Sequence, residues 1–408
     1  MKRDHILTKV RGQVLIIAII FLAVILIISA TLFSKVSSFL RFGNISAQAS
    51  QATTLAEAGV DNTVWLLNEN AGSCPAACTT ETTLGTVGTF KVTVVDNSPN
   101  LKTITSTGYI PNSTNPKSKR TVKVQLGIDS TTISFHYAAQ VGVDGINMKN
   151  NSTITGSGGV GNVYSNGNIT GSGSSVITGD AFAVGTISSP DPWVQGTKQA
   201  GATPMDMPVK EADLPAFYQY WKTKANINND PITCSPTCTI SSDTSIGPQQ
   251  YNGNLVISNN AIVTMNGPVY VTGNFSMTQG GTTLQLNPSF GSFGTTFIAD
   301  GTIDLRQGGK FLPTSANPKG YILVVTTSTL PNAVSINQSG ETAIFYALSG
   351  GAELEQSAGV TSLVANHVEM ENSATLTYDS GLSSASFTSG PGASWVIKKG
   401  TYKQIGSP

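Results

Sequence analysis

Four glutamates near the end of the chain have the spacing most suggestive of chemistry. One apolar residue separates Glu353 from Glu355, and one separates Glu369 from Glu371. Side chains of a β-strand alternate between its two faces, so each pair is expected on one outward face. A solvated acidic face is the first interpretation. Clustered carboxylates also suit calcium, or acid–base work on a sugar, and both remain alternatives in a chain with no expected resident cofactor.

Other catalytic constellations are sparse. The only histidines are His5, His136 and His367, and none of them lies in a recognisable nucleophile motif. The sequence therefore predicts a protein that is not an enzyme.

Four cysteines form two pairs with the same spacing. Cys74 and Cys78 enclose three residues, as do Cys234 and Cys238, and each loop contains a proline. Outside the cytoplasm two local disulfides are the favoured interpretation. Pairing between the two loops and a four-thiolate zinc site are alternatives.

An apolar run stands close to the N-terminus. Residues 14–33 are almost entirely aliphatic, and about twenty helical residues span about 30 Å, the hydrocarbon thickness of a bilayer. The preceding leader has four cations and one acid, which are Lys2, Arg3, Lys9, Arg11 and Asp4. This bias predicts a single-pass membrane protein with a cytoplasmic N-terminus and an extracytoplasmic bulk. A cleaved signal peptide, an uncleaved anchor and cleavage before the run are the three alternatives.

The start of the chain resembles the N-terminus of PilX-type minor pilins and related type IV pilin-like proteins. The matching features are the basic leader ending in Gly12, the apolar helix from Gln13 and the later LAEAGV stretch at 55–60. The resemblance implies cleavage by a prepilin peptidase between Gly12 and Gln13, with other pilin subunits and the pilus assembly machinery as partners. Most major pilins carry glutamate at the fifth mature position, where this chain has Ile17. That departure fits minor or tip-initiating members.

A second helical stretch follows the apolar run. Small and apolar residues recur at helical spacing between residues 44 and 67, which predicts an amphipathic helix with a possible bend at Gly43. Strand-like segments then appear at 89–95, 101–109 and 121–128. These elements predict a leader at 1–12, a helix at 13–70 and a small β subdomain at 71–128.

Composition limits the kind of partner. The 23 basic and 23 acidic residues cancel, so no overall field attracts nucleic acid, and none is expected as a partner. Lys117, Lys119 and Arg120 form a compact basic cluster that we interpret as a solvated loop. The 42 glycines and 11% charged residues are typical of repetitive β-structure.

A short unit recurs in the region 129–408, with apolar residues at its first and third places and an amide at its fifth. The seven amides are Asn150, Asn259, Gln279, Gln307, Gln338, Gln356 and Asn372. Stacked repeats of this kind predict a right-handed parallel β-helix with an amide ladder, and a β-sandwich is the competing fold. The pattern breaks at about 188–249, which predicts an insertion whose aromatic side chains fill a local core, and residues 386–397 are expected to form a last strand or a cap of the β-helix.

Together these features predict a mainly β protein: a transmembrane pilin-like helix, a small β-sheet head and a large β-helix. The leading functional hypothesis is a non-enzymatic minor pilin-like subunit that displays the β-helix at the cell surface or on a pilus, for adhesion or assembly. An uncleaved, membrane-anchored adhesin that binds glycans or a cell receptor is the second hypothesis. A polysaccharide-active enzyme is the third.

Overall fold

We describe a computed structural model of the chain that covers residues 8–70, 73–98, 101–128, 130–157, 161–188, 193–305, 308–338, 343–390 and 395–405. The protein is mainly β, with one long N-terminal helix. It divides into two compact units, which we call the helix unit and the parallel unit. The helix unit comprises Met1–Trp65, Cys74–Leu126 and Ile397–Pro408, and the parallel unit comprises Leu66–Ser73 and Gly127–Val396.

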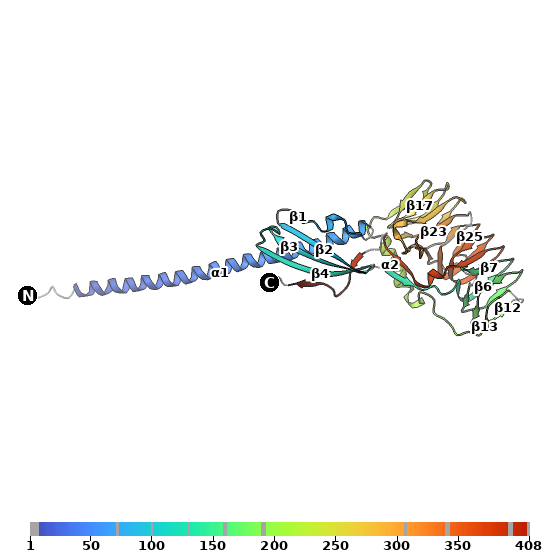
Figure 1. The fold of residues 1–408 in the computed structure, drawn as a ribbon, viewed down its shortest axis with the longest axis horizontal. Helices are drawn as coiled ribbons and strands as arrows, with labels where there is room; N and C mark the ends of the chain where they lie inside the picture. Colours follow the sequence, from blue (N-terminus) through green and yellow to red (C-terminus); the bar gives the residue numbers. More distant parts are fainter. Residues whose placement is uncertain are drawn as a thin grey trace, which may run out of the picture. The chain divides into compact units, whose positions relative to one another are not determined.

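Helix α1 (Thr8–Glu69) begins the chain and has two contrasting halves (Figure 1). The side chains from Val14 to Ser46 are exposed, whereas the small and apolar residues Ala52, Ala56 and Val60 are buried. The helix passes through Gly43 without interruption. The first half thus matches the predicted apolar run, and the second half is the amphipathic stretch that packs on the head.

The helix unit has a sheet of short and long strands, and this sheet packs on the second half of α1. Its strands are β1 (Thr82–Leu84), β2 (Gly88–Ser98), β3 (Leu101–Ile110), β4 (Ser118–Ile128), β31 (Trp395–Ile397) and β32 (Lys403–Ile405), after the turn η1 (Ala76–Cys78). Strands β1 to β4 are neighbours in chain order, and β32 pairs antiparallel with β4. Gly108 lies against the helix, since a Cβ there would stand 2.1 Å from the carbonyl oxygen of Ala52. A glycine is therefore required where β3 crosses α1.

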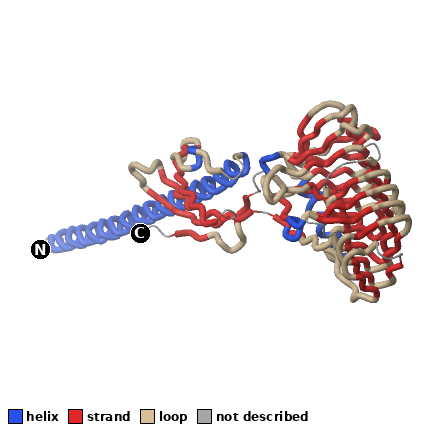
Figure 2. The backbone as a smooth tube through the Cα atoms, turned by 45° about the vertical axis from the view of Figure 1, so that its right-hand side comes forward, coloured by secondary structure: helices blue, strands red, loops and turns tan. Residues whose placement is uncertain are grey.

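The parallel unit contains a 16-stranded sheet and two four-stranded sheets (Figure 2). The large sheet holds β6 (Ala139–Met148), β8 (Val163–Ser165), β9 (Ile169–Gly171), β11 (Ala181–Ala183), β12 (Ile187–Ser188), β13 (Lys198–Ala200), β14 (Ile232–Ile240), β16 (Gln249–Ile257), β18 (Val269–Val271), β19 (Phe275–Met277), β21 (Thr295–Ala299), β22 (Ile303–Leu305), β24 (Ile322–Thr326), β25 (Val334–Asn337), β26 (Ile344–Glu355) and β28 (Ser362–Met370). The smaller sheets hold β7 (Thr153–Gly156), β10 (Val176–Ile177), β27 (Gly359–Val360) and β29 (Thr375–Tyr378), and β15 (Thr244–Ile246), β17 (Ile262–Met265), β20 (Thr283–Leu286) and β23 (Lys310–Leu312). The large parallel sheets are compatible with the expected β-helix.

Apolar side chains from the facing strands form one continuous core inside these sheets. The first and third residues of the predicted repeat point into it, as Leu255 and Ile257 illustrate with no exposed surface. Aromatic residues contribute to this core, and the ring centroids of Phe275 and Phe297 lie 4.4 Å apart. Burial of this core is the main stabilising contribution to the parallel unit.

The order of strands in the large sheet does not follow the order of the chain. Strand β6 is the first strand of the large sheet in chain order, and β28 is the last. These two strands pair in parallel, in a register that places Val368 beside Ile146. From β6 the chain continues through β8 and β11 to β13 at one edge. It then starts again at β14 and β16 and returns to β28. The chain therefore enters the large sheet at β6, in the middle of the strand order, and its last strand in this sheet is the neighbouring β28.

The segment that contains η2 (Glu211–Asp213) and helix α2 (Leu214–Ala225) packs on the outer face of the large sheet, and we call it the covering segment. Trp221 has no exposed surface, and Phe217 is also buried, so these aromatic side chains form a local core. The predicted insertion at 188–249 is too long. Strand β14 pairs in parallel with β16 from Ile232 onward, so the repeat resumes at that residue. The sequence pattern did not reveal this strand because the segment lacks the full amide signature.

Asp300 joins the covering segment to the large sheet. Its carboxylate accepts hydrogen bonds from Lys222 Nζ at 2.6 Å, Tyr270 Oη at 2.6 Å and Thr327 Oγ1 at 2.9 Å. Burial works to raise the pKa of Asp300, but the hydrogen bonds from Lys222, Tyr270 and Thr327 outweigh it and lower the pKa below its usual value.

A lowered pKa in the folded state means that ionised Asp300 stabilises the fold above the carboxyl's unfolded pKa. This contribution is lost as the pH falls through the lowered folded pKa. We therefore expect the stability of the wild-type protein to decline more steeply than that of Asp300→Asn as the pH is lowered from about 5 towards 2. Urea unfolding across this range measures the difference. The exposed Asp230→Asn variant is the control, and parallel pH profiles for all three proteins would refute the prediction.

The C-terminal segment differs from the prediction. Strand β30 (Ala385–Thr388), after η4 (Ser380–Ser384), pairs antiparallel with β5 (Ser130–Ile133). The chain from Ile397 onward belongs to the helix unit, where β32 lies beside β4. The predicted domain 129–408 therefore extends beyond the parallel unit, which ends at Val396. Residues 386–397 contribute to two short strands, β30 and β31, instead of to one last strand or cap of the large sheet.

Both cysteine pairs are local disulfides, Cys74 with Cys78 and Cys234 with Cys238. The first lies in the helix unit and the second in β14 of the parallel unit. Each closes a loop of three residues, so each shapes a turn and constrains the unfolded chain little.

Candidate functional site

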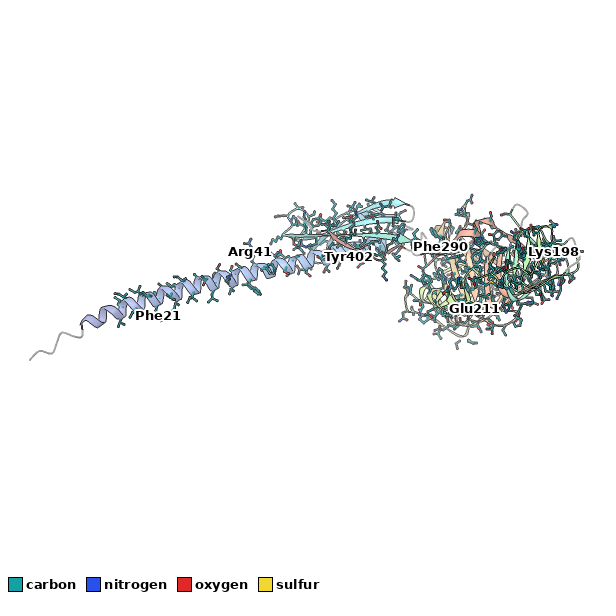
Figure 3. The ribbon with its side chains drawn as sticks, turned by 90° about the horizontal axis from the view of Figure 1, so that it is seen from below. Phe21, Arg41, Lys198, Glu211, Phe290 and Tyr402 are labelled. Carbon is teal, nitrogen blue, oxygen red and sulfur yellow. A yellow bond between two sulfur atoms is a disulfide. The ribbon has the colours of Figure 1, made fainter. Side chains whose placement is uncertain are left out.

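The exposed half of α1 is the largest apolar surface of the helix unit. Side chains such as Phe21 project from it (Figure 3), and Phe21 is 67% exposed while Phe39 is 78% exposed. Within the described residues, α1 is the one helix long and apolar enough to cross a membrane. A soluble domain rarely leaves so large an apolar surface in water, and the length and composition of this half of the helix fit a membrane anchor or a signal sequence.

Gly12 and Gln13, the predicted processing residues, lie inside α1 near its start. No family model, curated protein or solved structure matches this chain. The functional interpretation therefore rests on the residues and their geometry.

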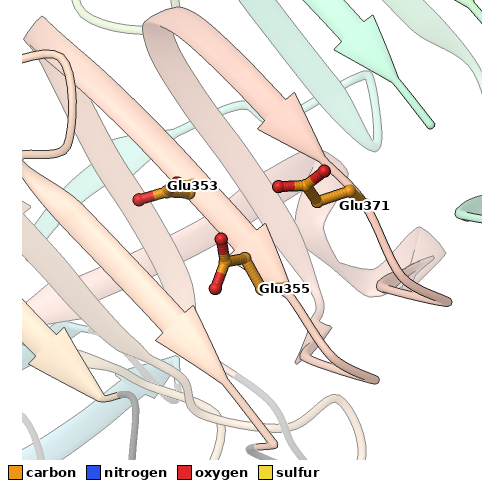
Figure 4. A group of neighbouring side chains, drawn as sticks. All are labelled: Glu353, Glu355 and Glu371. Carbon is orange, nitrogen blue, oxygen red and sulfur yellow. The ribbon is translucent and has the colours of Figure 1, made fainter. Parts of the chain in front are cut away.

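The outward carboxylates form a second candidate site. Glu353, Glu355 and Glu371 offer oxygen atoms that lie within 4.8 Å of one another (Figure 4). Their proximity follows from the register: Glu355 and Glu371 each follow a buried residue of the aligned pair Leu354 and Met370. All three are half-buried. Oxygen ligands at this spacing suit a hard divalent cation, so calcium binding stays the alternative to a solvated acidic face.

Glu369, the fourth predicted carboxylate, has a different partner. It lies beside Glu353 in the register of β26 and β28, and it forms an ion pair with Lys149. The hydrogen bond that Lys149 donates to Glu369 raises the pKa of Lys149, and the charges of Glu371 and Glu353 act in the same direction. Lys149 was not among the predicted site residues. Its position directly after β6 brings it here only because β6 pairs with β28.

The predicted amide ladder marks the corners of the repeat. Left-handed backbone occurs at five of its residues, with φ of 50° at Asn150, 55° at Asn259, 55° at Gln338, 46° at Gln356 and 56° at Asn372. Asparagine tolerates this conformation better than most residues, which explains the choice at Asn150, Asn259 and Asn372 but not at the two glutamines. Two side-chain contacts join neighbouring repeats: Asn150 Nδ2 donates to Asn372 Oδ1 at 3.1 Å, and Gln338 Nε2 donates to Gln356 Oε1 at 3.3 Å.

The remaining members of the ladder differ. Gln279 is not among the residues with left-handed backbone, and Gln307 lies outside the described residues. The amides therefore serve as corner residues more consistently than as a continuous chain of side-chain hydrogen bonds.

A second polar ladder was not predicted. Its repeating unit is a glycine followed by Asn, Asp or Thr, at 161–162, 179–180 and 196–197, at 167–168 and 185–186, and at 253–254, 273–274 and 301–302. In each row the side-chain oxygen accepts a hydrogen bond from the backbone N–H of the next repeat, as when Asn274 Oδ1 accepts from Thr302 N at 2.9 Å. The recurring glycine before a polar residue was the sequence signal that could have identified it.

From the second pair of each row onward, the glycine leaves room for the side-chain oxygen of the preceding repeat. A Cβ on Gly185 would stand 2.2 Å from Asn168 Oδ1, which accepts hydrogen bonds from the Thr186 backbone N–H at 2.8 Å and from its Oγ1 at 3.1 Å. The next nearest atom to that Cβ would be 3.1 Å away. The side chain of Asn168 is thus the main obstacle to any residue other than glycine.

We expect Gly185→Ala to destabilise the parallel unit by about 2 kcal/mol, because the methyl group displaces Asn168 and breaks its hydrogen bonds. Asn168→Ala should cost about 1 kcal/mol. In the double variant the obstacle is absent, so its loss should be smaller than the sum of the two single losses. Urea unfolding of the four proteins measures this coupling. Strict additivity would contradict the proposed steric cause.

Proposed function

We propose that the chain is a non-enzymatic minor pilin-like subunit of a type IV pilus or a related filament or secretion system. In this proposal α1 crosses the membrane once with its N-terminus in the cytoplasm. The parallel unit is a right-handed β-helix outside the cytoplasm, displayed for adhesion or for pilus assembly.

The exposed apolar half of α1 is the observation that carries this proposal. It belongs to the same unit as a packed sheet, and the buried residues of that unit begin only in the second half of the helix. Such a helix can lie in a bilayer first and exchange lipid for the helices of other subunits later. Ile17, which replaces the usual glutamate, adds no charge to the apolar surface.

The organisation of the parallel unit supports a display role. Its core contains apolar side chains in continuous contact, and the polar side chains described above mainly hold one repeat to the next. The cluster of Glu353, Glu355 and Glu371 is the best alternative for chemistry, and beside it Glu369 already pairs with Lys149 on the same outward face.

N-terminal mass spectrometry of the protein from native membranes and from sheared surface filaments tests the proposal. We expect a mature chain that starts at Gln13 in both fractions. An intact leader in every fraction would overturn the pilin assignment and leave a membrane-anchored adhesin. A prepilin peptidase-deficient strain provides the control, in which the mature N-terminus should disappear.

A further inference from the structure

Two lysines face each other across the sheet of the helix unit. Lys123 of β4 and Lys403 of β32 are direct partners in the antiparallel register. Side chains at such positions begin about 5 Å apart, and like charges there destabilise a sheet. Both lysines are exposed, and within the part of the chain that the structure describes neither forms an ion pair. A negative charge from another molecule would relieve this repulsion.

The lysine pair borders a hollow of about 270 Å³. Its other walls are Val124 and Gln125 of β4 and the residues Gly400 and Thr401 of the preceding turn. Hydrogen bonds fix that turn: Thr401 Oγ1 accepts from Gln125 N at 3.1 Å and donates to the carbonyl oxygen of Lys398 at 2.7 Å. The hollow is therefore bounded by backbone that is held in place before any ligand arrives.

The surroundings of the hollow are basic. Neither β4 nor β32 contains an aspartate or a glutamate. The turn contributes Lys398 and Lys399, which are both exposed. The basic cluster of Lys117, Lys119 and Arg120 lies at the start of β4. One acid lies nearby: Glu57 of α1 keeps its negative charge and accepts a hydrogen bond from Tyr402 Oη at 2.6 Å, and it is outnumbered by the lysines of β4, β32 and the turn. A protein with no net charge thus concentrates positive charge at one place.

We propose that the hollow between β4 and β32 binds a phosphate group. The ammonium groups of these two neighbouring lysines can each donate to a different oxygen of a tetrahedral anion, and lysine is a common phosphate ligand in proteins. The phosphate can come from the headgroup of an anionic phospholipid or from a soluble phosphate. This inference does not depend on the proposed pilus function, although a lipid source requires that α1 be embedded in a membrane.

The test follows the lysines themselves in the full-length protein. Reductive methylation with carbon-13 preserves the charge of each lysine and adds methyl groups whose resonances are observed by NMR. Single Lys→Gln variants assign each resonance to its lysine. In micelles of a neutral detergent, we expect inorganic phosphate to shift the resonances of Lys123 and Lys403 saturably. Sodium chloride at the same ionic strength controls for screening. Lys123→Gln should weaken the binding measured at Lys403 at least tenfold, and Lys91→Gln, at an exposed lysine of the same sheet, should leave it unchanged.

A second arm identifies the source. Nanodiscs of phosphatidylcholine alone are compared with nanodiscs that contain phosphatidylglycerol, without added phosphate. Shifts only with phosphatidylglycerol would support the lipid headgroup, and shifts only with soluble phosphate would support a soluble ligand. Equal shifts with chloride, no saturable shift with either phosphate source, or undiminished affinity in Lys123→Gln would overturn the proposal. Incorporation into nanodiscs, scored separately, shows whether the membrane anchor itself has failed.

Discussion

Trp221→Ala should destabilise the parallel unit by about 4 kcal/mol, because removal of a fully buried indole loses its burial energy and leaves a cavity. The ring contacts Tyr220 at a centroid distance of 5.1 Å and belongs to the cluster beneath the covering segment. That cluster includes outward side chains of the large sheet, such as Ile298 and Leu323. Loss of the indole therefore weakens the attachment of the whole segment.

Urea unfolding followed by circular dichroism measures this loss, since the transition of the parallel unit can be observed without tryptophan fluorescence. Trp65→Ala is the matched control, because Trp65 lies on α1 and is 58% exposed. We expect it to change stability by no more than about 0.5 kcal/mol. Similar losses in the two variants would show that the buried cluster does not hold the covering segment to the sheet.

The second large effect concerns the connection of the two units. We expect a variant in which residues 129–394 are replaced by a Gly-Ser linker of about four residues to keep a folded helix unit. The chain leaves this unit after β4 and returns beside the same strand, where Lys398 N donates to Gln125 O at 2.9 Å. The two chain ends that the linker joins therefore follow directly from neighbouring segments of the sheet, at β4 and before Lys398. The helix unit retains β32, which completes its edge.

Limited proteolysis and circular dichroism in detergent micelles measure the outcome. The shortened variant should resist cleavage within β2, β3 and β4 and retain the disulfide between Cys74 and Cys78. Removal of residues 398–408 from the same variant is the informative control, because it exposes β4 and removes the contact between Tyr402 and Glu57. We expect this further variant to be digested rapidly. Digestion of both variants would show that the helix unit needs the parallel unit in order to fold.

Local sequence patterns were sufficient to predict several elements. The apolar run and the amphipathic stretch after it predicted one long helix with two different halves, because each pattern depends only on residues a few positions apart. The strands expected at 89–95, 101–109 and 121–128 lie inside β2, β3 and β4. The repeat of apolar residues likewise predicted parallel strands, since neighbouring repeats present the same inward side chains to one core.

Long-range pairing could not be read from these patterns. The repeats on both sides of the covering segment look alike, so nothing in their local sequence shows that β6 lies beside β28. That pairing brings Lys149 to Glu369, which are 220 positions apart. It also places the ends of the parallel unit close together in the stack, which lets the chain return to the helix unit. The predicted domain 129–408 likewise extends past the end of the parallel unit at Val396, because the pairing of β32 with β4 is also long-range.

The sequence by itself determined the long apolar helix, the parallel repeat with its corner amides and the two local cysteine pairs, because these features arise from side-chain periodicity and short-range backbone preferences. The tertiary structure alone decided the meeting of β6 with β28, the attachment of β32 to β4 and hence the opposed lysines Lys123 and Lys403. Residues far apart in a chain become neighbours only when the whole core is packed, and the free energy that selects one pairing over another is shared among many buried contacts.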